Sequence, residues 1–463
     1  MCYNCDLKIA QDSIAPTFLP VHGIQFEVSA APAFVDEEVR IVLRGLAPRQ
    51  QVLIRAVAED DENRRWTSHA GFHGDSSGSV DLATQESLGG SYRTVSPMGL
   101  FWSMRLADEH TDGPAMFSKK DSSANPVTLV AEINGRVVAS ARIERDFHAS
   151  GTETRDLKIG GGADGQSPGH VATLFIPPSF SGRGTLPVVI VLGGSGGGFD
   201  LDKAAVLSRH GFATLALAYF GILPLPSWLH RIPLDYFEAA LAWLAGQPEI
   251  DSRRIGIIGV SRGAELALLL GTRFAQVRAV VAFAPSSVAW GAGGRDKATG
   301  KNIPAWLWRD EPLPFAPLPL RDFMLRSAFP VAVLRRPVMF RKLFRAALRN
   351  RDAVARAAIP VEQIAGSILL VSGGDDHVWP AAEMSEAIVA RLKHRHFAYS
   401  VEHLHYPHAG HMLRYPHLPT TPRHSRNLHL RNAHYSFGGT ASADAQAQSD
   451  SWRRAIEFLR ASL

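Results

Sequence analysis

The sequence contains very little cysteine. Its 463 residues include two cysteines, Cys2 and Cys5, which are separated by two residues. One such pair cannot form the network of disulfides that holds small secreted domains together. A redox or metal role would need a βαβ unit or a second Cys/His pair nearby, and the neighbouring sequence has neither. We therefore assign no redox or metal function to these cysteines.

The sequence also lacks long apolar runs. No stretch reaches the roughly 18 apolar residues that a membrane-spanning helix needs, so we expect no membrane span. Residues 1–5 lack a basic region followed by an apolar core, and residues 460–463 do not form the peroxisomal address Ser-Lys-Leu. These absences favour a cytoplasmic protein.

The formal net charge of +5 suits an acidic partner. Nucleic acid and a small substrate bearing phosphates both meet that condition. Because the sequence contains no recognisable nucleic-acid-binding module, we expect a small molecule rather than nucleic acid. The composition and charge of the sequence do not indicate an oligomeric state.

The first third of the chain has the pattern of short β-strands. Apolar and polar residues alternate in short segments separated by turn residues, which predicts a β-sandwich over residues 18–150. Examples of these segments are residues 25–28, 39–44, 52–57 and 127–132. Residues 151–184, rich in glycine and serine, read as a linker with the first strands of the next domain.

Residues 185–463 alternate between continuous apolar runs and helical patterns. This alternation predicts a mostly parallel sheet with helices on both faces. An insertion at about residues 286–360, rich in proline, tryptophan and arginine, interrupts the rhythm and is expected to cover the carboxyl edge of the sheet. Within it, residues 337–358 read as one basic helix.

The motif Gly259-Val260-Ser261-Arg262-Gly263 lies between an apolar strand and a helix-forming run. A G-x-S-x-G in that setting is the nucleophile elbow of an α/β-hydrolase. Its two glycines permit a turn so sharp that a Cβ at either position would clash. The turn is expected to present the Ser261 hydroxyl above the sheet.

A serine hydroxyl needs a base, and the base needs an acid to orient it. In this fold the acid and the histidine follow the serine in chain order. Asp376 follows the apolar run 368–371 and is the preferred acid, with Asp375 as its competitor. His411 is the preferred base, with His408 as the nearest alternative in a segment rich in histidine.

An oxyanion hole requires two backbone N–H groups near the nucleophile. We assign the N–H of Arg262 and one from the glycine-rich loop 193–198, either Gly194 or Ser195. A phosphate-binding loop is the rival interpretation of these glycines. The loop lacks a clear G-x-G-x-x-G register, and the elbow therefore favours the oxyanion role.

The chain resembles the family of acyl-CoA thioesterases and bile acid-CoA:amino acid N-acyltransferases. The resemblance covers nearly the whole chain and rests on residues 42–48, 88–92, 97–102, 193–198, 211–219, 259–265, 375–379 and 406–411. It implies an N-terminal immunoglobulin-like β-sandwich and a C-terminal α/β-hydrolase domain. It also implies a triad of Ser or Cys, Asp and His, which falls on Ser261, Asp376 and His411.

The transferase branch of this family is associated with cysteine at the nucleophile position, so Ser261 favours hydrolysis. The resemblance implies cleavage of acyl-CoA thioesters to free acid and CoA through an acyl-serine, without a metal or other cofactor. The alternatives are a carboxylesterase or peptidase with the same triad, an acyl-CoA N-acyltransferase, and a binding protein on a hydrolase scaffold. The complete triad argues against the last.

The insertion supplies candidate substrate contacts. Its cations would suit the phosphates of CoA, with a solvated helix face as the equal alternative; they are Arg335, Arg336, Arg341, Lys342, Arg345, Arg349 and Arg351. Trp290, Trp306 and Trp308 are candidates to line an acyl pocket, or else ordinary core.

Overall fold

The computed structural model describes residues 23–29, 32–108, 115–159, 170–180, 182, 184–296, 299–328, 334, 336–426 and 434–463. Cys2, Cys5, Arg335 and much of the predicted linker lie outside these residues. Within the described residues, no helix is both long and apolar enough to cross a membrane.

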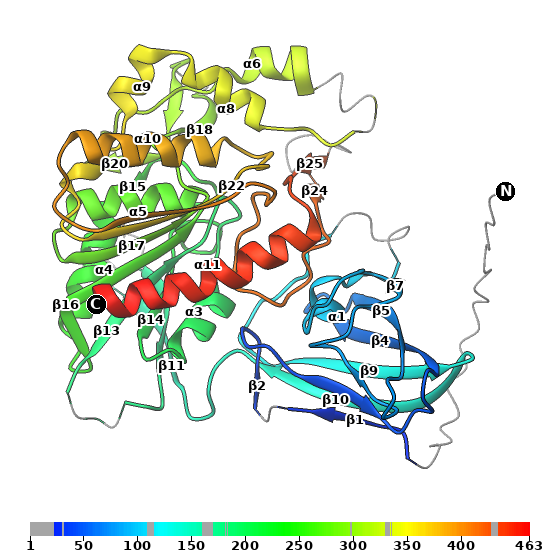
Figure 1. Cartoon of the computed structure of the whole chain (residues 1–463). Coiled ribbons are helices and arrows are strands. Elements are labelled where there is room, and N and C mark those ends of the chain that lie inside the picture. Colours follow the sequence, from blue (N-terminus) through cyan, green and yellow to red (C-terminus); the bar gives the residue numbers. More distant parts are fainter. Residues whose placement is uncertain are drawn as a thin grey trace.

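Two sheets form the N-terminal part of the molecule, at the lower right of Figure 1. The three-stranded sheet contains β1 (Gln25–Val28), β3 (Ile41–Arg44) and β6 (Val80–Asp81). The larger sheet contains β2 (Ala33–Phe34), β10 (Arg136–Asp146), β9 (Asn125–Ile133), β4 (Gln51–Glu59), β5 (Arg65–His73), β7 (Gly89–Gly90) and β8 (Arg105–Leu106). The short helix α1 (Gly99–Trp102) follows β7.

Alternating burial explains why these segments form sheets. Every second residue of β4 is buried, from Val52 through Ile54 to Ala58, so one face of the strand meets the core and the other does not. Buried residues of both sheets, including Ile41 and Ile54, belong to one hydrophobic cluster. The strand pattern that the sequence predicted is therefore present over this region.

An eight-stranded sheet forms the centre of the second part, in the order β11-β12-β14-β13-β16-β17-β22-β23. The pairs β11–β12 and β12–β14 are antiparallel, and the remaining pairs are parallel. Its strands are β11 (Glu153–Ile159), β12 (His170–Ile176), β13 (Leu186–Leu192), β14 (Ala213–Ala218), β16 (Ile250–Val260), β17 (Val277–Phe283), β22 (Ser367–Gly373) and β23 (Val401–Tyr406). The first two come from the segment read as linker and first strands.

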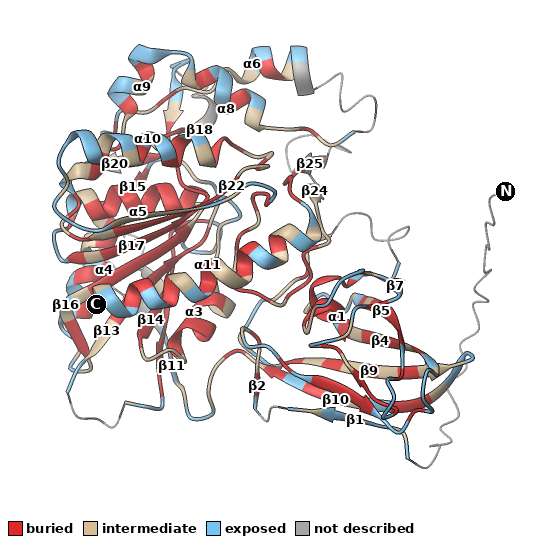
Figure 2. Cartoon of the chain, in the orientation of Figure 1, coloured by how far each residue is buried: buried red, intermediate tan, exposed pale blue. Residues whose placement is uncertain are grey.

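Helices cover both faces of this sheet (Figure 1). On one face α3 (Leu201–Ser208) and α11 (Ala441–Ser462) pack with Val189 and Val191 of β13. On the other face α4 (Asp235–Ala245), α5 (Arg262–Arg273) and α10 (Ala381–His394) pack with Val188 and Ile190. A strand buried on both faces reads as a continuous apolar run, and Figure 2 shows the central strands of this sheet largely buried.

The insertion lies above the carboxyl edge of the sheet, at the top of Figure 1. It contains β18 (Gly291–Arg295), β19 (Asn302–Pro304), β20 (Trp306–Trp308), β21 (Glu311–Pro312), α6 (Leu320–Phe323), a π-turn (Met324–Ala328), α8 (Arg341–Leu348), α9 (Arg351–Ala357) and a 3₁₀ turn (Val361–Gln363). Strand β15 (Ile232–Pro233) pairs with β20. A last hairpin, β24 (His424–Arg426) with β25 (His434–Ser436), joins the insertion where Val338 N–H donates to His434 O (2.7 Å).

The single basic helix expected at residues 337–358 is wrong, because the structure has two helices there. The break falls at Asn350, whose side-chain oxygen accepts a hydrogen bond from Ala353 N–H (3.1 Å) and caps the second helix, α9. Asparagine favours such capping over a helix interior because its amide competes with the backbone hydrogen bonds. The apolar spacing alone did not reveal this break.

A buried ion-pair cluster joins the two parts of the chain. The carboxylate of Asp36, from the N-terminal part, accepts hydrogen bonds from Arg209 (2.9 Å), His210 (2.7 Å) and Trp452 Nε1 (2.9 Å). The Asp36 side chain is 2% exposed. Burial alone would raise the pKa of Asp36, but the hydrogen bonds from His210 and Trp452 and the charges of His210 and Arg209 outweigh it and lower the pKa.

We expect Asp36→Ala to destabilise the protein by about 3–5 kcal/mol, because it removes the buried acceptor shared by Arg209, His210 and Trp452 and leaves Arg209 with Glu37 as its remaining carboxylate partner. The control Glu144→Ala breaks an exposed pair with Arg142 and is expected to cost less than about 1 kcal/mol. Urea unfolding at pH 7 measures both losses. Because the native pKa of Asp36 is lowered, ionised Asp36 stabilises the fold above the unfolded value of 3.8, and this contribution is lost as the pH falls below it. The difference in unfolding free energy between wild type and Asp36→Ala should therefore narrow in acid. Equal losses in the two variants would contradict this role.

Candidate active site

Ser261 lies at a strained turn between β16 and α5. Its backbone has φ 57° and ψ −119°, a conformation that residues other than glycine rarely adopt. A Cβ on Gly259 would lie 2.2 Å from the Gly263 carbonyl oxygen, and one on Gly263 would lie 2.3 Å from the Gly193 oxygen. The predicted need for both glycines is confirmed.

His411 faces the Ser261 hydroxyl. It lies in the loop between β23 and β24, and its Nε2 is 3.0 Å from Ser261 Oγ. On the other side of the ring, Nδ1 is 2.7 Å from Asp376 Oδ2. All three side chains are buried, with exposed fractions of 8% for Ser261, 5% for His411 and 1% for Asp376. The three therefore form one hydrogen-bonded row that water scarcely reaches.

The backbone fixes the Asp376 carboxylate. Its Oδ1 accepts hydrogen bonds from the N–H groups of Val378 (2.8 Å) and Trp379 (3.1 Å), which leaves Oδ2 to face His411. Since an ionised carboxylate only accepts, His411 Nδ1 carries the proton and Nε2 presents its lone pair to the Ser261 hydroxyl. The Trp379 ring also packs edge-on against the imidazole, 6.0 Å between centroids. This tautomer suits proton abstraction from Ser261.

The two competing residues point elsewhere. Asp375 is 44% exposed at its side chain, contacts His377 Nε2 (3.0 Å) and accepts a hydrogen bond from Gly439 N–H (3.0 Å). His408 is exposed. The geometry thus brings Asp376 and His411 to Ser261 and leaves Asp375 and His408 outside the row.

The glycine-rich loop after β13 approaches Ser261 at Gly194. A Cβ built on Gly194 would lie 3.5 Å from the Ser261 Cβ, whereas Ser195 is exposed. The loop is held from behind, since Tyr219 Oη donates to Gly193 O (2.7 Å) and Gly198 N–H donates to Phe220 O (2.8 Å). Arg262 is the first residue of α5, where N–H groups lack a partner within the helix. Backbone from both segments thus lies next to Ser261.

A buried carboxylate beneath the elbow was not found from the sequence. Glu265, one turn into α5, is fully buried and pairs with Arg262 (2.8 Å). Its Oε1 accepts hydrogen bonds from Trp290 N–H (3.0 Å) and Trp306 Nε1–H (2.6 Å). Burial raises the pKa of Glu265 more than these partners lower it. Glu265 therefore fastens the insertion to the elbow.

This network also decides the role of two of the tryptophans. Trp290 and Trp306 are 0% and 1% exposed, so they belong to the core between the insertion and α5. Trp308 is partly buried and packs edge-on against Phe274, which belongs to the hydrophobic cluster on the α5 side of the sheet (5.9 Å between ring centroids). The signal for Glu265 was the acidic residue in an otherwise apolar helical run, four residues after the nucleophile.

Two of the cations on α8 are engaged within the protein. Arg341 donates to Gly374 O (3.3 Å) and lies 3.9 Å from Asp375, so it supports the loop that carries Asp376. Arg345 pairs with Glu383. Others are exposed on this surface: Arg336, Lys342, Arg349 and Arg351. These four stay candidates for substrate phosphates.

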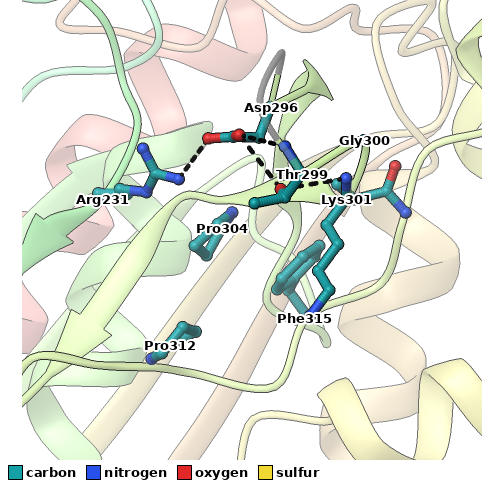
Figure 3. Close-up of a pocket in the computed structure, with 9 residues that line it drawn as sticks. Arg231, Asp296, Thr299, Gly300, Lys301, Pro304, Pro312 and Phe315 are labelled. Atoms are coloured by element: carbon teal, nitrogen blue, oxygen red, sulfur yellow. Dashed lines mark hydrogen bonds and ion pairs between the residues drawn. The ribbon is translucent and has the colours of Figure 1, made fainter.

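A cavity of about 670 Å³ lies between Arg231 and residues of the insertion. Figure 3 shows Lys301 extending beside the Phe315 ring, with Arg231 directed at Asp296 (2.7 Å) across the opening. Pro304 and Pro312 complete its apolar wall. Sequence reasoning missed it because Arg231 and Phe315 are far apart in the chain. Among the described residues, no group of three or more His, Cys, Asp and Glu side chains is placed to hold a metal ion.

Two family profiles match the chain. Residues 232–463 match the family described as BAAT / acyl-CoA thioester hydrolase C terminal, and residues 36–159 match the acyl-CoA thioester hydrolase/BAAT N-terminal region. The two matches include the elbow, the Asp376 loop and the His411 loop. The similarity therefore covers most strands of the N-terminal sheets and the residues around Ser261.

Similar proteins align over most of their length. Acyl-coenzyme A thioesterase 1 of Mus musculus is 31% identical over 441 residues, which cover 92% of this chain and 94% of that protein. Mitochondrial acyl-coenzyme A thioesterase 2 of Rattus norvegicus is 31% identical, with 92% and 87% covered. The peroxisomal succinyl-coenzyme A thioesterase of Mus musculus is also 31% identical, with 92% and 93% covered.

Solved structures resemble the chain more distantly. A putative dienelactone hydrolase from Klebsiella pneumoniae covers 67% of this chain and 99% of its own, at 16% identity and a TM-score of 0.40. A puromycin-hydrolyzing peptidase from Mycobacterium tuberculosis covers 88% of this chain and 53% of its own, at 14% identity and a TM-score of 0.42.

Replacement of Glu265 tests whether it fastens the insertion. Glu265→Ala leaves Arg262 and two tryptophan N–H groups without their acceptor, and we expect a loss of about 3–5 kcal/mol in unfolding free energy. Glu265→Gln keeps an acceptor oxygen and should lose less. Because the native pKa is raised above the unfolded value of 4.5, the wild-type contribution falls as pH rises above that value, and the Gln variant should lack this slope.

Urea unfolding from pH 5 to pH 8 checks both expectations. Glu383→Ala, which breaks an exposed pair with Arg345, is the matched control and should cost less than about 1 kcal/mol. A Glu265→Ala variant as stable as this control would show that the buried contacts contribute nothing.

Proposed function

The chain belongs to the BAAT and acyl-CoA thioester hydrolase family, and on that premise we propose that it hydrolyses acyl-CoA thioesters to a free acid and CoA. The observation that carries this proposal is the buried row of Asp376, His411 and Ser261, with contacts of 2.7 and 3.0 Å. In this proposal Ser261 is the nucleophile, His411 the general base and Asp376 the acid that orients it. The names of the similar thioesterases support acyl-CoA as the substrate.

The reaction proceeds in two halves. Ser261 Oγ attacks the thioester carbonyl carbon while His411 Nε2 takes the hydroxyl proton. The carbon–sulfur bond then breaks, His411 returns the proton to the CoA sulfur, and the acyl group stays on Ser261. In the second half His411 takes a proton from water, which attacks the acyl-serine carbonyl carbon. The bond to Ser261 Oγ then breaks, His411 returns the proton to that oxygen, and the acid is released.

Two backbone N–H groups stabilise the oxyanion in both halves. One is that of Arg262, and the other is that of Gly194 or Ser195. The approach of Gly194 to Ser261 supports Gly194 as the second donor. Arg336, Lys342, Arg349 and Arg351 are proposed to attract the CoA phosphates, a contribution that added salt would weaken.

The proposal includes the domain division and the compartment. Residues 18–150 form an immunoglobulin-like β-sandwich, residues 151–184 the linker and first strands, and residues 185–463 the α/β-hydrolase domain. The shared core of the two N-terminal sheets supports the first assignment. Cytoplasmic location stays a prediction, since similar proteins carry mitochondrial and peroxisomal names.

Release of free CoA from short to long acyl-CoA esters tests this function. Ser261→Ala should lose most turnover, and Asp376→Asn should lose about 10⁴-fold because its amide cannot hold the productive imidazole tautomer. Asp375→Asn is the matched control, since the same change one residue away leaves the hydrogen-bonded row intact.

The outcomes separate the alternatives. Turnover that survives Ser261→Ala would end the serine mechanism. Turnover of p-nitrophenyl esters but of no acyl-CoA would show a carboxylesterase, and an acyl conjugate formed with an added amine would show an N-acyltransferase.

A further inference from the structure

One edge of helix α11 holds the loop that carries His411. Three contacts join them: Thr440 N–H donates to His408 O (3.2 Å), Asp444 Oδ1 accepts from Gly410 N–H (2.7 Å), and Gln448 Nε2 donates to Met412 O (2.7 Å). The contacts fall on both sides of His411 along the chain. The loop is therefore fixed immediately before and immediately after the imidazole.

The spacing of these contacts is regular on both partners. Asp444 and Gln448 are four residues apart on one face of α11, and Thr440, four residues before Asp444, is the N-cap of that helix. The loop residues they contact are two apart, and turns on either side of Gly410 are closed by Ala409 N–H to Tyr406 O (3.1 Å) and Leu413 N–H to His411 O (2.9 Å). The start of the helix thus contacts this loop at three successive points, which restricts the movement of His411.

The two contacts from within the helix are made by buried polar side chains. Asp444 is 5% exposed and Gln448 is 2% exposed. Burying a carboxylate is costly unless a specific contact returns energy. A Cβ on Gly439 would lie 2.5 Å from Asp444 Oδ1, so the chain also closes tightly over this carboxylate.

We propose that Asp444 and Gln448 are positioning residues for His411, which hold its imidazole within hydrogen-bond distance of Ser261. The inference rests on the proposed role of His411 as general base. Neither side chain touches the reacting atoms, and both act through the backbone of Gly410 and Met412. Loosening the loop should therefore lower turnover without changing substrate binding.

The charge environment of Asp444 adds a pH dependence to this positioning. Burial raises the pKa of Asp444 to about 7, against the Gly410 hydrogen bond and the charge of Arg423, which lower it. The charges of Asp375 and Asp376, on the loop after β22, contribute to this raised value. Asp444 therefore changes charge near neutral pH, whereas asparagine cannot ionise, so Asp444→Asn should remove this contribution to the pH profile.

The experiment compares Asp444→Ala, Asp444→Asn and Gln448→Ala with the control Gln446→Ala, an exposed residue on the same helix. The rate at which a fluorophosphonate probe labels Ser261 is measured together with kcat and KM for acyl-CoA. Circular dichroism verifies folding. The probe reports on Ser261 and His411 without a thioester, so its result stands even if acyl-CoA is not the substrate.

We expect both alanine variants to lose about 10²-fold in labelling rate and in kcat, with KM unchanged, as a misplacement near 1 Å would cause. Asp444→Asn keeps the acceptor oxygen and should restore the rate at pH 7. Its kcat/KM profile should differ from that of the wild type near pH 7, where Asp444 changes charge. Gln446→Ala should match the wild type.

Labelling rates within about twofold of the wild type in folded Asp444→Ala and Gln448→Ala would overturn the inference. So would an equal loss in Asp444→Asn and Asp444→Ala with an unchanged pH profile, because the role would then be structural only. If Asp444→Ala does not fold, Gln448→Ala and Asp444→Asn decide the matter. Wild type that labels but turns over no acyl-CoA would refute the proposed function alone.

Discussion

The close approach of two backbones is the constraint on which the site depends. The turn at Ser261 exists only because Gly263 can pass against the carbonyl oxygen of Gly193, where a Cβ would lie 2.3 Å away. The same approach brings the glycine-rich loop after β13 to the nucleophile. One steric condition therefore places the hydroxyl and two candidate oxyanion donors, although Gly194 and Ser261 are far apart in the chain.

The order of the parallel strands explains how much of the site the sequence could predict. Strands β13, β16, β22 and β23 share one sheet, and the loops after them meet at its carboxyl edge. Ser261 directly follows β16, Asp376 comes three residues after the end of β22, and His411 lies in the loop after β23. Apolar runs and glycines in the sequence mark such strand ends, so pattern reasoning could bring all three side chains to one edge. Asp375 follows the same strand as Asp376, and the hydrogen bonds of the structure, rather than the strand pattern, distinguish the two.

Patterns in the sequence could not predict the long-range polar contacts. Glu265 reads as an ordinary acidic residue in the first turn of a helix, and only its burial against Trp290 and Trp306 gives it a role. Asp444 likewise reads as an ordinary acidic residue in the first turn of α11, and its contact with Gly410 is visible only in the structure. The pattern of apolar residues also did not reveal the helix break at Asn350, whose side chain caps α9 and divides the basic segment into two helices. In each case the decisive partner is set by tertiary packing or by one side-chain hydrogen bond rather than by periodicity.

The face of α11 that meets the His411 loop continues to the junction between the two parts of the chain. Trp452 lies four residues beyond Gln448 on that face, and its Nε1–H donates to Asp36 of the N-terminal part (2.9 Å). The helix thus contacts the His411 loop at its start and, about three turns later, a buried ion-pair cluster. The same helix therefore contacts both the His411 loop, through Asp444 and Gln448, and the N-terminal part, through Trp452.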